Sequence, residues 1–144
     1  MNYLDTSFLT PLFREEPVSG RVGRFLAGQP PGSLAISQWT RVEFASVMAR
    51  DVRMQSIDDA MARRLINEFD TLAAESLHVL IPAAADFDLA QTFIVEFSTR
   101  LRGPDALHLA IARNNDVDSI LTLDDGLLFA ARKLKITTRR GIRA

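Results

Sequence analysis

The sequence predicts an α/β fold built on a parallel sheet, and two observations lead to that prediction. Short apolar runs alternate with longer segments of helical period along the chain, an alternation typical of a sheet covered by helices. The runs are also too short to form solvent-faced hairpins, and parallel strands are instead buried between helices. We therefore expect a parallel α/β sandwich.

The first part of the chain predicts a strand, a helix and a second strand. Met1–Asp5 is a short apolar run, and Thr6–Arg14 follows it directly with the spacing of a helix. The strongest break is Gln29–Gly32 (QPPG), because proline and glycine favour turns over regular structure. The run Ser33–Ser37 (SLAIS) that follows predicts the second strand.

The middle of the chain predicts two helices and a third strand. Apolar residues recur every three or four positions in Trp39–Arg53 and again in Asp58–Ser76. The second of these segments begins with acids, which suit the positive N-terminal end of a helix. His78–Ile81 (HVLI) predicts a short strand that Pro82 ends.

The last part predicts three helices and two strands. Ala83–Leu101 has helical period, and Gly103–Pro104 breaks it before a helix restarts at Asp105–Arg113, with Pro104 suited to its first turn. The remaining segments are a strand, a helix and a strand: Ser119–Leu123, Gly126–Lys133 and Ile136–Thr138.

Length and composition indicate one globular domain without cysteine chemistry. A chain of 144 residues is long enough for one full core and too short for two typical domains, so we expect residues 1–144 to form a single domain. The absence of cysteine excludes disulfides, thiolate zinc sites and cysteine nucleophiles. The first residues, MNYLD, lack the basic start of a signal peptide, and no uncharged stretch approaches the roughly 18–20 residues that span a bilayer. We therefore expect a cytoplasmic protein with no membrane partner.

Basic residues are distributed unevenly although the formal net charge is only −1. Fifteen are Arg and two are Lys, and Arg is the better bidentate partner for phosphates and carboxylates. No acid follows Asp125. This tail is either a solvated surface or an edge that contacts anions, and its basic residues are Arg132, Lys133, Lys135, Arg139, Arg140 and Arg143.

Four acids fall where a parallel sheet would bring them together. Asp5 ends the first predicted strand, Asp124 ends the fourth, and Asp105 opens a helix after the Gly-Pro break. Glu43 lies one to two turns into the helix after the second strand. Ligands of open α/β sheets bind beyond the C-terminal ends of the strands, so these carboxylates can converge. Each of them could instead be an ordinary helix cap or first-turn acid.

Converging carboxylates repel one another unless a cation neutralises them. Oxygen ligands select hard cations, so we expect Mg²⁺ or Mn²⁺ rather than zinc. A cation held in this way can activate water and stabilise charge on a phosphoryl group. The pattern therefore indicates hydrolysis of phosphodiester bonds.

Four segments resemble the motif blocks of PIN-domain proteins, and more narrowly those of the VapC-type toxin ribonucleases of toxin–antitoxin pairs. They are YLDTSFL, WTRVEFASV, RGPDALHLAIA and LTLDDGLLFAA, in the family's order from Met1 to about Ile136. The resemblance implies a three-layer α/β/α sandwich with a five-stranded parallel sheet in the order 3-2-1-4-5. It also implies a metal-dependent endoribonuclease that acts on RNA, a cognate antitoxin protein that blocks the site, and commonly a homodimer.

The resemblance assigns roles residue by residue. Its four metal-binding acids match Asp5, Glu43, Asp105 and Asp124, in that order. Three hydroxyl positions, expected to orient the carboxylates or a metal-bound water, match Thr6, Ser7 and Thr122. Asp125 offers a second acid in the last block; the family's spacing favours Asp124 as the site acid and leaves Asp125 to cap the following helix.

Several other interpretations remain open at this stage. A receiver domain would need an aspartate after the third strand, and a haloacid-dehalogenase-type phosphatase would need a second acid at Ser7; the chain has neither. A PIN fold without activity could serve as a module that binds RNA or protein. His108 could join Asp105 on a metal, but a hydrogen bond to a neighbour is the simpler expectation, and we expect Trp39 in the core or an interface.

Overall fold

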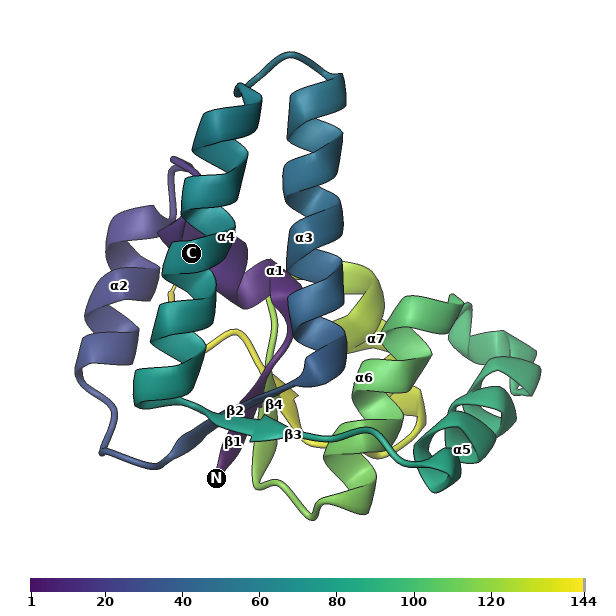
Figure 1. Ribbon diagram of the computed structural model, residues 1–144. Helices are drawn as coiled ribbons and strands as arrows, with labels where there is room; N and C mark the ends of the chain where they lie inside the picture. Colours follow the sequence, from purple (N-terminus) through teal and green to yellow (C-terminus); the bar gives the residue numbers. More distant parts are fainter. Residues whose placement is uncertain (144) are drawn as a thin grey trace.

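A computed structural model describes residues 1–143 and orders the five parallel strands as β3-β2-β1-β4-β5 (Figure 1). The predicted fold class and strand order are confirmed. Central β1 pairs with β4 so that Tyr3 lies opposite Ile120 and Leu4 opposite Leu121. The strands are β1 (Asn2–Leu4), β2 (Leu34–Ser37), β3 (His78–Leu80), β4 (Ser119–Leu121) and β5 (Thr138–Arg139).

Helices cover both faces of the sheet and give it three layers. On one face Tyr3 and Ile120 pack with α5, α6 and α7, and on the other Leu4, Ile36 and Leu121 pack with α1 to α4. Figure 1 shows α3 and α4 as a long pair that lies side by side and extends past the sheet. The α-helices are α1 (Thr6–Leu9), α2 (Ser19–Ala27), α3 (Gln38–Arg53), α4 (Asp59–Ser76), α5 (Ala84–Val95), α6 (Gly103–Asn114) and α7 (Asp125–Lys133), and the 3₁₀ turns are η1 (Thr10–Leu12) and η2 (Phe97–Thr99).

The structure differs from the predicted elements mainly near proline and glycine. The helix predicted over residues 6–14 is one short turn, α1, followed by η1, because Pro11 has no N–H to continue an α-helix. The sequence does not predict α2, in which Gly20 and Gly23 weaken the local signal. Helix α5 ends at Val95 rather than near residue 101, and the chain then turns through Arg100 at φ 56°.

The strands deliver two of the predicted acids to one edge of the sheet. Asp5 follows β1 directly and is the N-cap of α1, accepting a hydrogen bond from the Phe8 amide. Asp124 follows β4 and is the N-cap of α7, accepting from the Leu127 amide. Among residues 1–143, no helix is both long enough and apolar enough to cross a membrane.

Candidate active site

The four predicted acids line one open cleft of about 810 Å³. Asp5 comes from the end of β1, Glu43 from α3, Asp105 from the first turn of α6, and Asp124 from the end of the β4 segment. Thr6 and Ser7 also line the cleft, whereas Thr122 is fully buried behind Asp5. The structure therefore brings together the acids that the motif blocks predicted, from four segments distant in the sequence.

Asp5 is the most constrained of these acids, with 3% of its surface exposed. The hydroxyl of Ser7 donates to one carboxylate oxygen at 2.7 Å, and that of Thr122 donates to the other at 2.9 Å. Burial is the dominant influence and raises the pKa of Asp5, although the charge of His108 and the hydrogen bonds from Ser7 and Thr122 partly offset it. These bonds fix the carboxylate in a single orientation and favour its ionised form.

Glu43 is held by a network of hydrogen bonds that sequence reasoning missed. Its Oε1 accepts from the hydroxyl of Thr6 at 2.7 Å and makes a very short contact with Nε2 of His108. The other ring nitrogen, Nδ1, lies 2.7 Å from the hydroxyl of buried Tyr3. Burial would raise the pKa of Glu43, but the hydrogen bond and charge of His108, with Thr6, outweigh it and lower the pKa.

Asp105 and Asp124 both line the cleft, but their surroundings differ. Asp124 is exposed and uses one oxygen to cap α7, accepting from Leu127 N at 2.8 Å. Asp105 is half-buried, and its pKa is raised to about 6, first by burial and then by the negative charges of Asp124, Asp5 and Glu43. The four carboxylates therefore repel one another through the space of one cleft.

The structure corrects the prediction for Asp125. Asp124, not Asp125, caps α7, because its backbone is extended (ψ 119°) and places its side chain over the first turn. Asp125 is the first helical residue; it is exposed, pairs with Arg140, and does not line the cleft. One acid of the pair thus serves both the cap and the cleft.

The donor set suits a hard divalent cation, although it is not gathered into a closed site. Across residues 1–143, no three His, Asp or Glu side chains converge as a ready group of metal ligands. Two of the acids also make hydrogen bonds of their own: Glu43 is held by Thr6 and His108, and Asp124 caps α7. Mg²⁺ usually keeps several waters and needs only one or two carboxylates directly. The mutual repulsion around Asp105 is what such an ion would relieve.

The basic tail does not gather at the cleft. Arg139 hydrogen-bonds to Ser119 at the start of β4, and the carbonyl of Arg143 accepts from Arg21. Arg140 contacts Asp125, which does not line the cleft, and the carbonyl of Leu123. The cleft itself is lined by basic residues from other segments, namely Arg14, Arg50 and Arg53.

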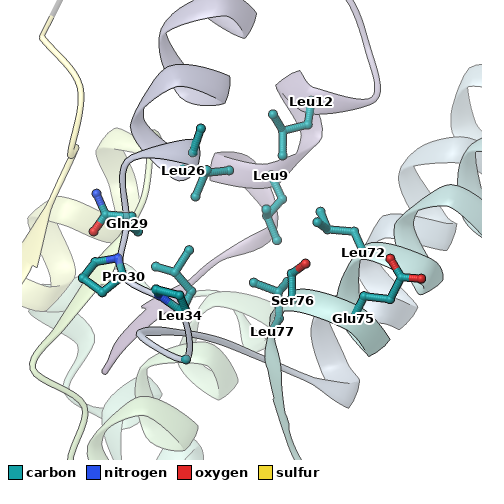
Figure 2. Close-up of a pocket in the computed structure, with 13 residues that line it drawn as sticks. Leu9, Leu12, Leu26, Gln29, Pro30, Leu34, Leu72, Glu75, Ser76 and Leu77 are labelled. Atoms are coloured by element: carbon teal, nitrogen blue, oxygen red, sulfur yellow. The ribbon is translucent and has the colours of Figure 1, made fainter.

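A second hollow, of about 450 Å³, lies between η1, α2, α4 and the loop before β2 (Figure 2). Its lining is mainly leucine and proline, as Leu9, Leu26 and Leu72 illustrate, and Glu75 is its single titratable side chain. None of the four acids lines it. It therefore lacks the groups for hydrolysis that the acidic cleft provides.

Comparison with known proteins agrees with this fold and with the motif blocks. The model of the PIN domain family matches residues 3–133. The chain therefore belongs to the PIN domain family. No curated protein sequence matches it at a significant level.

Solved structures with low sequence identity share the fold. VapC20 from Mycobacterium tuberculosis, described as a toxin that cleaves the sarcin–ricin loop, is 19% identical, with a TM-score of 0.73 over 90% of this chain and 95% of that one. FitAcB from Neisseria gonorrhoeae is 17% identical, with a TM-score of 0.70 over 98% of both chains. A toxin–antitoxin complex from Klebsiella pneumoniae is 19% identical, with a TM-score of 0.59 over 86% of this chain and 87% of that one.

Proposed function

We propose that this protein is a Mg²⁺- or Mn²⁺-dependent endoribonuclease that acts as the toxin of a toxin–antitoxin pair. The observation that carries the proposal is the convergence of Asp5, Glu43, Asp105 and Asp124 on one cleft of a PIN fold. Burial and, after it, the repulsion from the other three acids raise the pKa of Asp105, and this repulsion supports a role in binding a divalent cation. The description of VapC20 as a toxin that cleaves the sarcin–ricin loop supports the proposed cleavage activity and the biological role.

The chain's own residues divide the work of the reaction. Carboxylate oxygens of three acids that line the cleft would hold the ion, namely those of Asp5, Asp105 and Asp124. Ser7 and Thr122 orient the carboxylate of Asp5. Glu43 would be a fourth ligand if its carboxylate contacted the ion while keeping its hydrogen bonds to Thr6 and His108. A bound divalent ion lowers the pKa of a coordinated water and neutralises charge that develops on the phosphoryl group. No side chain then has to act as a covalent nucleophile.

We further propose the partners and setting that belong to such a toxin. They are an RNA substrate, a cognate antitoxin and a second copy of the chain in a homodimer, within the cytoplasm. Support for the antitoxin comes from the Klebsiella pneumoniae structure, which is a toxin–antitoxin complex. We treat residues 1–144 as a single PIN-like domain, in keeping with the match over residues 3–133.

A catalytically silent PIN module that binds RNA or protein is the second candidate. It is favoured by one observation: the acids are not gathered into a ready group of metal ligands in residues 1–143. Against it, all four acid positions of the motif blocks are filled.

The substitution Asp5→Asn separates the two candidates. It keeps the size of a buried residue and removes the charge, so a nuclease should lose cleavage while keeping its affinity for its cognate antitoxin. The matched control is Asp88→Asn, an exposed acid on α5 outside the cleft, which should leave both properties unchanged. Cleavage by Asp5→Asn at the rate of the unsubstituted protein would rule out the metal-nuclease proposal.

A further inference from the structure

The candidate active site occupies only one end of its cleft. The cleft continues along α3, where Ser46, Val47, Arg50 and Arg53 line it beyond Glu43. These positions recur at spacings of one, three and four residues, so one stripe of the helix faces the cleft. At 1.5 Å per residue, the backbone at Arg50 lies about 10 Å and that at Arg53 about 15 Å along the axis from Glu43. We call this part of the cleft, lined by Ser46, Val47, Arg50 and Arg53, the arginine arm.

The two arginines of this arm are free cations. Both are exposed, and within residues 1–143 neither makes an ion pair. Nearby Arg14 differs, because its guanidinium lies 3.3 Å from Asp51 and 3.6 Å from Glu16. The charges along the cleft are therefore unevenly distributed: Glu16 in its lining is paired with Arg14, the four predicted acids lie together, and Arg50 and Arg53 are unpaired.

A position in the last turn of α3 suits a basic residue, since the C-terminal end of a helix is negative. That effect accounts for the sign of Arg50 and Arg53 but not for their joint position on the wall of the acidic cleft. An RNA strand that reaches the four acids is repelled by them, and cations along the same cleft offset that cost. Guanidinium groups are the side chains best suited to bidentate contacts with phosphate.

We propose that Arg50 and Arg53 bind backbone phosphates of single-stranded RNA on one side of the bond to be cut. This inference rests on the proposed function and deepens it. The other residues of the arm are Ser46 and Val47, so it offers no aromatic side chain on which a base could stack. It therefore positions the strand without reading its sequence.

The test is equilibrium binding of a fluorescently labelled single-stranded RNA in EDTA, where a metal-dependent enzyme cannot cut it, over a range of salt concentrations. Losing two phosphate contacts should reduce the slope of log affinity against log salt by about 1.4 in the Arg50→Gln/Arg53→Gln variant. If the unsubstituted protein and the double variant bind the RNA equally at 1 M salt, this difference in slope makes the variant bind about 25-fold more weakly at 0.1 M salt. The matched control is Arg63→Gln on α4, an exposed arginine paired with Asp59 outside the cleft; its slope should stay unchanged.

The outcomes also separate this proposal from the proposed function. In Mg²⁺, the double variant should show a higher KM for RNA with an unchanged kcat. If the unsubstituted protein cuts no RNA but the double variant shows the smaller salt slope, phosphate binding by the arginine arm is supported and the nuclease proposal is overturned. If the unsubstituted protein cuts RNA and the double variant shows an unchanged salt slope, only the proposal for the arginine arm is overturned. An unchanged RNA slope together with weaker binding of a polyglutamate peptide would overturn it in favour of an acidic protein segment.

Discussion

Replacing Asp105 with Asn should stabilise the metal-free protein while it destroys the proposed activity. The folded protein raises the pKa of Asp105 from 3.8 to about 6, through burial and then the charges of Asp124, Asp5 and Glu43. Between these two values the folded state holds a proton that the unfolded state has released. The free energy of unfolding therefore falls as the pH rises from about 4 through 6, and the loss is complete above the folded-state value.

The size of this effect follows from the change in proton affinity. A tenfold change in proton affinity corresponds to about 1.4 kcal/mol. Without solvent screening, the shift at Asp105 would therefore lower the free energy of unfolding by about 3 kcal/mol. Asp105 is only half-buried, and solvent screening reduces the figure to about 1–2 kcal/mol. For a chain of 144 residues, a gain of this size raises Tm by roughly 3–8 °C.

The assay is thermal and urea unfolding in EDTA at pH 5 and pH 8, with the unsubstituted protein, Asp105→Asn and the surface control Asp88→Asn. Asp105→Asn should be the more stable protein at pH 8, and its advantage should shrink at pH 5. Asp88→Asn should follow the unsubstituted protein at both values. If Asp105→Asn were less stable than the unsubstituted protein at pH 8, the inferred repulsion among the four acids would be refuted.

Three further predictions concern the site and the core. His108→Ala should lower kcat more than it raises the KM for RNA, and it should weaken Mn²⁺ binding measured by electron paramagnetic resonance, since Glu43 loses its buried partner. An unchanged Mn²⁺ affinity would show that His108 does not position Glu43. Added Mg²⁺ should raise the Tm of the unsubstituted protein and leave that of Asp5→Asn nearly unchanged; equal shifts would place the ion elsewhere. Phe44→Ala should cost about 3–5 kcal/mol in urea unfolding, because Phe44 is fully buried and stacked on Phe69 at 4.3 Å, whereas exposed Phe97→Ala should change stability by less than about 0.5 kcal/mol.

Local sequence patterns predicted most of the fold because the signals were strong where the elements are long. Helices α3 and α4 have apolar residues at helical spacing and begin and end within one residue of the predicted bounds. The strand order came from the motif blocks instead, since apolar runs do not specify which strands are neighbours. The short elements were harder: Pro11 divides α1 from η1, and the glycines of α2 hide an amphipathic helix.

The candidate site shows the same limit in its side chains. The four acids could be predicted because each lies at a fixed place relative to a strand or helix. The hydrogen bonds that support Glu43 could not be predicted in this way. His108 joins Tyr3 to Glu43, and these partners lie 105 and 65 positions from it in the sequence. The cap of α7 was assigned to Asp125 instead of Asp124 for a related reason: which of two adjacent acids caps a helix depends on the backbone angles at each.

The most direct test of the central claim is cleavage of total cellular RNA by antitoxin-free protein, with Mg²⁺, with Mn²⁺ and with EDTA, beside Asp5→Asn. We expect discrete fragments with either metal and none with EDTA or with the variant, and end-mapping of the fragments would identify the target RNA. Intact RNA in every reaction, from protein shown to be folded and free of antitoxin, would contradict the claim and favour the binding module.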